Sequence, residues 1–95
     1  MFVKNPEYFI TIANERSISK SAEKLYLSQP YLSQYLAKLE ANLGVTLLDR
    51  SHTPLRLMPA GELFLAYLES QRYLDRQLED DLRQLQDHRQ QTLHI

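Results

Sequence analysis

Apolar residues that recur every three or four positions predict a helix near the start of the chain. Asn5 can cap this helix, Pro6 suits its first position, and Glu7 favours the positive end of the helix dipole. The pattern therefore predicts a helix over residues 5–15, followed by a polar break. Its inward stripe consists of Phe9, Ile12 and Ala13.

A second, shorter helix is expected over residues 19–26. Ser19 is the expected cap, because a serine hydroxyl can accept a hydrogen bond from the first turn of a helix. Ala22, Leu25 and Tyr26 are the side chains expected to face inward.

The third predicted helix spans residues 29–43 and has the clearest signals in the chain. Ser28 is a good cap, Pro30 removes only an amide that has no partner in a first turn, and Gly44 is a typical helix stop. The inward stripe has spacings of four, three and four, and consists of Leu32, Leu36, Leu39 and Leu43.

A small hairpin and one long helix complete the predicted elements. Residues 46–48 and 55–57 are short β-compatible runs, and the segment 50–54 joins them. Pro59 opens the last helix, and neither proline nor glycine occurs between positions 62 and 90, which predicts about 30 helical residues. The expected fold class is mainly α: three helices and a small β-hairpin, followed by a long helix.

The long helix carries two different apolar patterns. Its first part has closely spaced apolar residues that can pack on the small domain: Leu63, Phe64, Tyr67 and Leu68. Farther along, a single stripe with spacings of four, four and three has nothing in its own chain to bury it: Leu74, Leu78, Leu82 and Leu85. Either this part is a solvated tail, or it pairs with another chain in a parallel or antiparallel arrangement. Gln71 interrupts the stripe, which argues against a strict heptad zipper.

Composition and charge exclude several classes of function for this chain. The chain has no cysteine, which excludes a disulfide framework and thiolate zinc sites and suits a reducing cytoplasm. No apolar run approaches the roughly 20 residues that span a bilayer, so no membrane partner is expected. Net charge is only −1, but stretches 24–39 and 50–61 contain no acid. A surface built from these two stretches would be positive, as nucleic acid requires.

The face of the third predicted helix opposite its leucines is polar and free of acids. It presents Gln29, Tyr31, Ser33, Gln34, Tyr35 and Lys38. Glutamine can bond the N6 and N7 atoms of adenine in the major groove, and serine can pair with several base edges. Two helices joined by a tight turn, the second with such a face, follow the helix-turn-helix arrangement. The alternative is an ordinary solvated helix surface.

Several motifs together resemble the N-terminal domain of LysR-type transcriptional regulators. They run over positions 17–33, 39–50 and 57–61 in the family's order and spacing, and include Ser28-Gln29-Pro30, Leu43-Gly44 and Pro59-Ala60-Gly61. The resemblance implies a winged helix-turn-helix DNA-binding domain over 1–58 and a linker helix over 59–91 that mediates dimerisation. It also implies a C-terminal effector-binding domain that is missing here, with residues 92–95 at the start of its first strand.

The resemblance also assigns roles to residues. Base-reading positions fall on Gln29, Pro30, Ser33 and Gln34, and phosphate positions on Ser28, Lys38 and Arg50. The wing, over 51–56, contributes His52 and Arg56, and Tyr31 is expected to contact thymine methyls or phosphates. Where the family often has arginine this chain has Gln34, and where it has a capping threonine this chain has Met58. The dimerisation residues are expected to be Leu63, Tyr67, Leu74, Leu78, Leu82 and Leu85.

The implied partners are double-stranded DNA with an interrupted inverted repeat and a second copy of the chain. A small-molecule effector is expected to act only through the missing domain. No cofactor, metal or enzymatic activity is expected, because the histidines at 52, 88 and 94 form no ligand cluster and no catalytic set is visible. The competing hypothesis is a protein-interaction module, in which the long helix is the working surface and the winged helix is a scaffold.

Overall fold

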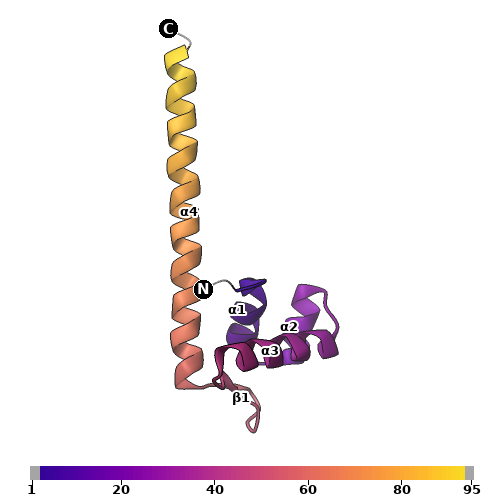
Figure 1. Ribbon diagram of the computed structural model, residues 1–95. Helices are drawn as coiled ribbons and strands as arrows, with labels where there is room; N and C mark the ends of the chain where they lie inside the picture. The colour runs from indigo at the N-terminus through magenta and orange to yellow at the C-terminus, as the bar shows by residue number, and fades with distance from the viewer. Residues whose placement is uncertain (1–2, 94–95) are drawn as a thin grey trace.

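The computed structural model describes residues 3–93 and shows a small domain of three helices and a hairpin at one end of a long helix (Figure 1). This arrangement confirms the mainly α, winged helix-turn-helix fold predicted from the sequence. The molecule is elongated, with extents of 64 × 26 × 20 Å. The elements are α1 (Pro6–Glu15), α2 (Ile18–Leu25), α3 (Gln29–Leu43), β1 (Leu48–Asp49), β2 (Arg56–Leu57) and α4 (Pro59–Leu93).

The ends of α3 follow the predicted signals. The hydroxyl of Ser28 accepts a hydrogen bond from the amide of Tyr31 at 3.3 Å, which caps the first turn. Gly44 ends the helix with a left-handed backbone (φ 72°), and its amide donates to the carbonyl of Glu40. The predicted bounds of this helix are therefore confirmed.

One predicted cap lacks its capping hydrogen bond, and another is wrong. Asn5 stands at the N-cap of α1, but its backbone is left-handed (φ 50°) and its side chain makes no capping hydrogen bond. Helix α2 begins at Ile18, because Ser17 rather than Ser19 is its cap. The extended backbone of Ser17 directs its hydroxyl to the amide of Lys20, at 3.2 Å.

The core lies where α1, α2, α3 and the first turns of α4 meet. Ring centroids of Phe9 and Phe64 lie 5.1 Å apart in an edge-to-face contact that joins α1 to α4. The expected inward position of Tyr26 is wrong: this side chain is 96% exposed, because the residue ends α2 with a left-handed backbone (φ 57°). The largest fully buried apolar side chains are Phe9, Ile12, Leu32, Leu36, Leu47 and Leu48.

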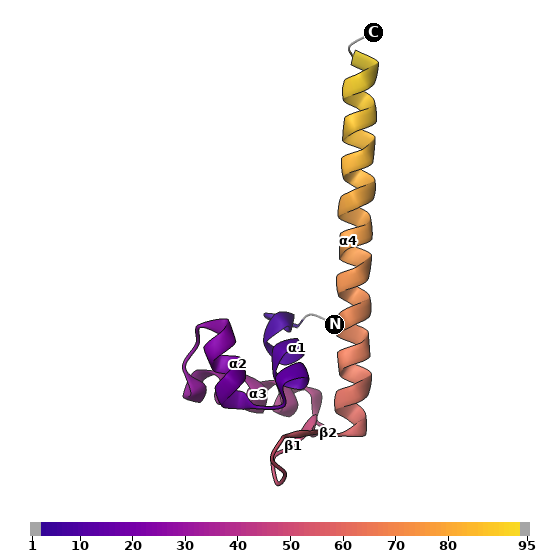
Figure 2. The ribbon, with the colours of Figure 1, turned by 180° about the vertical axis from the view of Figure 1, so that it is seen from behind.

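The hairpin consists of two antiparallel strands that are shorter than predicted. Leu48 pairs with Leu57, and Asp49 pairs with Arg56. Two backbone hydrogen bonds of 2.9 Å fasten the hairpin to the domain: Leu55 donates to the carbonyl of Arg16, and Met58 donates to the carbonyl of Leu47. The hairpin therefore has a fixed position at the base of α4 (Figure 2).

The first turn of α4 packs closely on the segment that leads into the hairpin. A Cβ atom at Gly61 would overlap the carbonyl oxygen of Leu47, so only glycine fits at this position without a backbone shift. Phe64 and Leu68 are buried as predicted. Leu63 was expected to pack on the small domain as well, but its side chain is 76% exposed. The buried side chains of α4 that pack on the domain lie in these first turns.

Beyond Leu68, α4 projects away from the domain, and every described side chain from 69 to 87 is exposed (Figure 1). The helix ends at Leu93, two residues later than predicted. Thr92 and Leu93 are therefore helical and do not begin a strand, and residues 94 and 95 lie outside the described residues. Within residues 3–93, no helix combines the length and apolar character needed to cross a bilayer.

Candidate nucleic-acid interface

The outer face of α3 is a continuous exposed polar surface. Leu32 and Leu36 are fully buried behind it and hold the helix against the core. All the predicted contact residues at the start of this helix and along its outer face are exposed: Ser28, Gln29, Pro30, Tyr31, Ser33, Gln34 and Lys38. An exposed helix face of this kind is what a helix needs in order to enter a DNA groove.

Two exposed alanines lie on the same face and were not predicted as site residues. Ala37 and Ala41 follow Gln34 by three and seven positions, which places all three along one side of the helix. Their small side chains allow the backbone of α3 to come closer to a groove floor than longer side chains would. Small residues opposite a leucine stripe are the signal that could have identified them.

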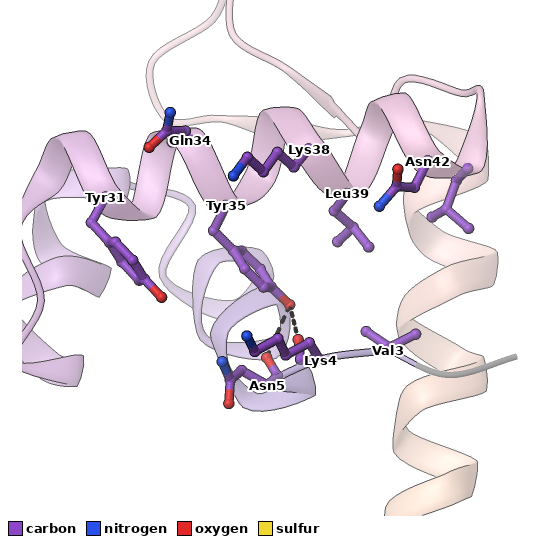
Figure 3. A pocket seen from close by; sticks show the side chains of 10 residues that line it. Val3, Lys4, Asn5, Tyr31, Gln34, Tyr35, Lys38, Leu39 and Asn42 are labelled. Atoms are coloured by element: carbon purple, nitrogen blue, oxygen red, sulfur yellow. Dashed lines mark hydrogen bonds between the residues drawn. The ribbon is translucent and has the colours of Figure 1, made fainter.

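Tyr35 does not belong to the outer face, contrary to the sequence-based expectation. Its hydroxyl donates to the carbonyl oxygens of Lys4 and Asn5, both at 2.9 Å, and its ring meets the edge of Tyr8 at 5.2 Å (Figure 3). Burial, with smaller contributions from Glu7 and Tyr8, raises the pKa of Tyr35 to about 12. The hydroxyl therefore remains protonated at neutral pH and holds the N-terminal segment against α3.

The hairpin brings an acid to the predicted wing cations. Asp49 lies opposite Arg56 in the strand pairing, and its carboxylate is 3.6 Å from Nε2 of His52. Arg56 in turn places Nη1 3.3 Å from the same His52 nitrogen. Hydrogen bonds from Ser51, helped by His52 and Arg56, lower the pKa of Asp49. The wing is therefore less positive than an acid-free segment 50–61 suggested.

Arg50 lies beside α3 through an ion pair that the sequence did not reveal. Its Nη2 is 3.2 Å from Oε1 of Glu40, whose side chain is only 16% exposed. The other oxygen, Oε2, accepts hydrogen bonds from the amides of Leu47 at 2.7 Å and Leu48 at 3.3 Å. Glu40 therefore connects α3 to the segment between α3 and β1 and to Arg50. About half of the Arg50 side chain remains accessible.

The predicted dimerisation residues are largely uncovered. Tyr67 differs from the others, because it is half-buried and stacks on Phe64 with centroids 6.4 Å apart. The remaining five are between 55% and 76% exposed: Leu63, Leu74, Leu78, Leu82 and Leu85. Helical spacing places these leucines along one side of α4. Among the described residues, no group of three or more potential ligands could hold a metal ion.

Comparison with known proteins adds independent findings. Residues 4–62 match the family model described as "Bacterial regulatory helix-turn-helix protein, lysR family". The chain is 42% identical over 94 residues to an uncharacterised HTH-type transcriptional regulator, YcgK of Bacillus subtilis strain 168, and covers 28% of it. It is 37% identical over 67 residues to the HTH-type transcriptional regulator BenM of Acinetobacter baylyi, a match that covers 70% of this chain and 22% of BenM. The chain thus spans about a quarter of the length of these curated relatives.

Solved structures resemble the fold over most of the chain. A crystal structure of the BenM DBD with benA site 1 DNA superposes with a TM-score of 0.80 at 30% identity and covers 90% of this chain and 96% of that one. The CbnR DBD in its complex with DNA gives a TM-score of 0.76 at 35% identity, covering 87% and 95%. In both cases the similarity extends over the winged domain and well into the long helix.

Proposed function

Because the chain belongs to the LysR family of bacterial regulatory helix-turn-helix proteins, we propose that it binds specific sequences of duplex DNA as part of a transcription regulator. Helix α3 enters the major groove, and the hairpin lies over the neighbouring backbone. The observation that carries this proposal is the exposed outer face of α3, which is polar, free of acids and backed by buried leucines. Related domains with the same fold were crystallised with DNA.

Within this proposal, the finer assignments follow from side-chain chemistry. Gln29, Ser33 and Gln34 read base edges through hydrogen bonds, and Pro30 makes apolar contact with a base. All four side chains are exposed in the first half of α3. The other predicted contact residues bind the phosphate backbone, either beside α3 or under the wing: Ser28, Tyr31, Lys38, Arg50, His52 and Arg56. Arg50 and Arg56 contribute less charge than their number suggests, since Glu40 and Asp49 lie beside them.

The proposed assembly is a homodimer formed through the leucines of α4. Two-fold symmetry then requires an interrupted inverted repeat with both half-sites on one face of the DNA. The same proposal divides the chain into a DNA-binding domain over 1–58 and a linker helix over 59–91. A small-molecule effector would act through a further domain in a longer chain. We expect no catalytic activity, and the DNA that such a bacterial regulator binds lies in the cytoplasm.

Fluorescence anisotropy tests the DNA-binding proposal. The wild-type chain is titrated onto duplexes from the promoter region of its own gene and onto a shuffled duplex of equal length and composition. We expect preference for one promoter duplex, and Gln34→Ala should reduce that preference by about tenfold, the effect of losing one good base contact. Gln84→Ala, an equivalent truncation on the exposed part of α4, should leave it unchanged.

Equal affinity of the wild-type chain for promoter and shuffled duplexes would refute sequence-specific binding. The exposed leucines of α4 favour a second candidate function, a protein-interaction module with the winged domain as scaffold. That alternative requires Gln29→Ala combined with Arg50→Ala to preserve regulation in cells, while Leu78→Glu abolishes it. Loss of regulation in the first variant supports DNA reading.

A further inference from the structure

A groove runs along the flank of α3 between this helix and the N-terminal segment (Figure 3). Its volume is about 430 Å³. Val3 and Lys4 border it on one side, and Tyr31, Lys38 and Asn42 border it on the other. Glu40 and Arg50 do not line it. We call this feature the N-terminal groove.

The N-terminal groove is positively charged. Two amines, those of Lys4 and Lys38, are among the lining residues, and no carboxylate is. Neither lysine forms an ion pair within the described part of the chain, whereas Lys24 on α2 pairs with Glu15 at 2.8 Å. An anion in the groove would therefore meet two amines without an ion-pair partner among the described residues, with the carboxylate of Glu7 acting on the neighbouring Tyr35.

The groove is continuous with the outer face of α3. Tyr31, Gln34 and Lys38 belong to both, so a ligand that contacts this face reaches the rim of the groove without a gap. Apolar side chains, Leu39 and Leu43, contribute to its lining. A chain in which anionic phosphates alternate with sugars suits this lining, because the phosphates can meet the amines and the sugar carbons can meet the apolar side chains.

Tyr35 fixes the far side of the groove. Its hydroxyl bonds to the carbonyls of Lys4 and Asn5, and the left-handed backbone of Asn5 turns the chain into α1 at this point. The backbone of Lys4 is consequently held beside α3, while its side chain remains exposed. A lysine placed in this manner loses less freedom on binding than one on a loose terminus.

We propose that the N-terminal groove binds the phosphodiester backbone of DNA beside the bases that α3 reads, with Lys4 and Lys38 contacting phosphates from its two sides. The proposal rests on the proposed DNA-binding function and extends its surface to a segment outside the helix-turn-helix and the wing. Lys4 adds affinity without sequence preference, because phosphate contacts carry no base information.

The test is the salt dependence of DNA affinity between 50 and 200 mM salt, measured by anisotropy on the preferred and shuffled duplexes. Each phosphate contact contributes about 0.9 to the slope of log K against log salt. Lys4→Gln should reduce the slope by about 0.9 and weaken binding equally on both duplexes. Arg76→Gln, which removes the same charge from the exposed part of α4, should leave the slope unchanged.

A second variant adds charge to the N-terminal groove. Asn42→Lys places an amine on its rim and should steepen the slope by up to about 0.9, whereas Gln84→Lys on α4 should not. Unchanged slopes in both Lys4→Gln and Asn42→Lys, with sequence preference intact, would overturn the groove proposal and leave the proposed function standing. Loss of all preference in the wild-type chain would instead overturn the proposed function.

Analytical ultracentrifugation of the same variants tests whether a second protein molecule, rather than DNA, occupies the N-terminal groove. If Lys4→Gln changes the mass of the chain in solution and not the salt slope, the groove is a contact between protein molecules and the proposal is overturned. Thermal unfolding of each variant, followed by circular dichroism, should match the wild type, since Lys4 and Asn42 are exposed.

Discussion

Within residues 3–93, three residues other than glycine adopt a left-handed backbone, and each lies next to one end of a helix. Asn5 precedes α1, Arg16 follows it, and Tyr26 follows α2. This conformation costs an L-residue roughly 1–2 kcal/mol, and asparagine tolerates it better than most. Tyr26 is the clearest case, because its side chain is 96% exposed and gains almost nothing from packing.

We predict that Tyr26→Asn stabilises the domain. Relief of the left-handed strain should raise the free energy of unfolding by about 1 kcal/mol, which corresponds to an increase of about 4–8 °C in Tm for a domain of this size. Thermal unfolding followed by circular dichroism measures the shift. Tyr73→Asn, an exposed tyrosine inside α4, should give no gain because asparagine is a poor helix former. A lower Tm for Tyr26→Asn would contradict the argument.

Among the elements, α3 was the most predictable because all its signals are local. Its leucine spacing, Ser28 and Gly44 lie within the helix or directly beside it. The start of α2 was misjudged because Ser17 and Ser19 are both competent caps, and the left-handed turn at Arg16 decides between them. Capping by either serine looks equivalent in the sequence.

Contacts between segments far apart in the sequence account for the errors in the predicted site. Tyr35 faces inward because carbonyls 30 and 31 residues away lie within reach of its hydroxyl. Asp49 meets Arg56 only through the register of the hairpin, and Arg50 meets Glu40 only through the turn after α3. Helical periodicity predicted the exposure of most of the α3 face but not that of Tyr35, and it could not predict which cations already have an acidic neighbour.

At the junction between α3 and the hairpin, we predict that Glu40→Ala lowers the free energy of unfolding by about 2 kcal/mol. The substitution leaves the amides of Leu47 and Leu48 without their carboxylate acceptor. Glu40→Gln keeps an acceptor oxygen and should lose less. Urea denaturation measures these changes, with Glu23→Ala, an exposed acid on α2, as the control. Equal losses in Glu40→Ala and Glu23→Ala would show that the loop does not depend on this carboxylate.

As a whole molecule, the chain separates a packed domain from a long uncovered helix (Figure 1). The leucines of α4 expose apolar surface that no other described residue of the chain covers. We predict that Leu78→Glu converts the proposed dimer into a monomer, because a buried charge without a partner is costly. Analytical ultracentrifugation measures the mass, and Gln84→Glu, away from the leucine side, is the matched control. A wild-type chain that sediments as a monomer would contradict the proposed pairing.

The close contact at Gly61 bears on that pairing, because a small change in the direction of α4 at its base would move its far end by a large distance. At about 1.5 Å per residue, the 33 residues from Gly61 to Leu93 extend roughly 50 Å. A side chain at Gly61 that tilted the helix by 10° would carry its far end sideways by about 9 Å, close to the distance between two packed helices. In the proposed dimer, the outer leucines would then miss their counterparts. In the proposed dimer on DNA, the distance between the two α3 helices would therefore depend on the backbone contact at Gly61.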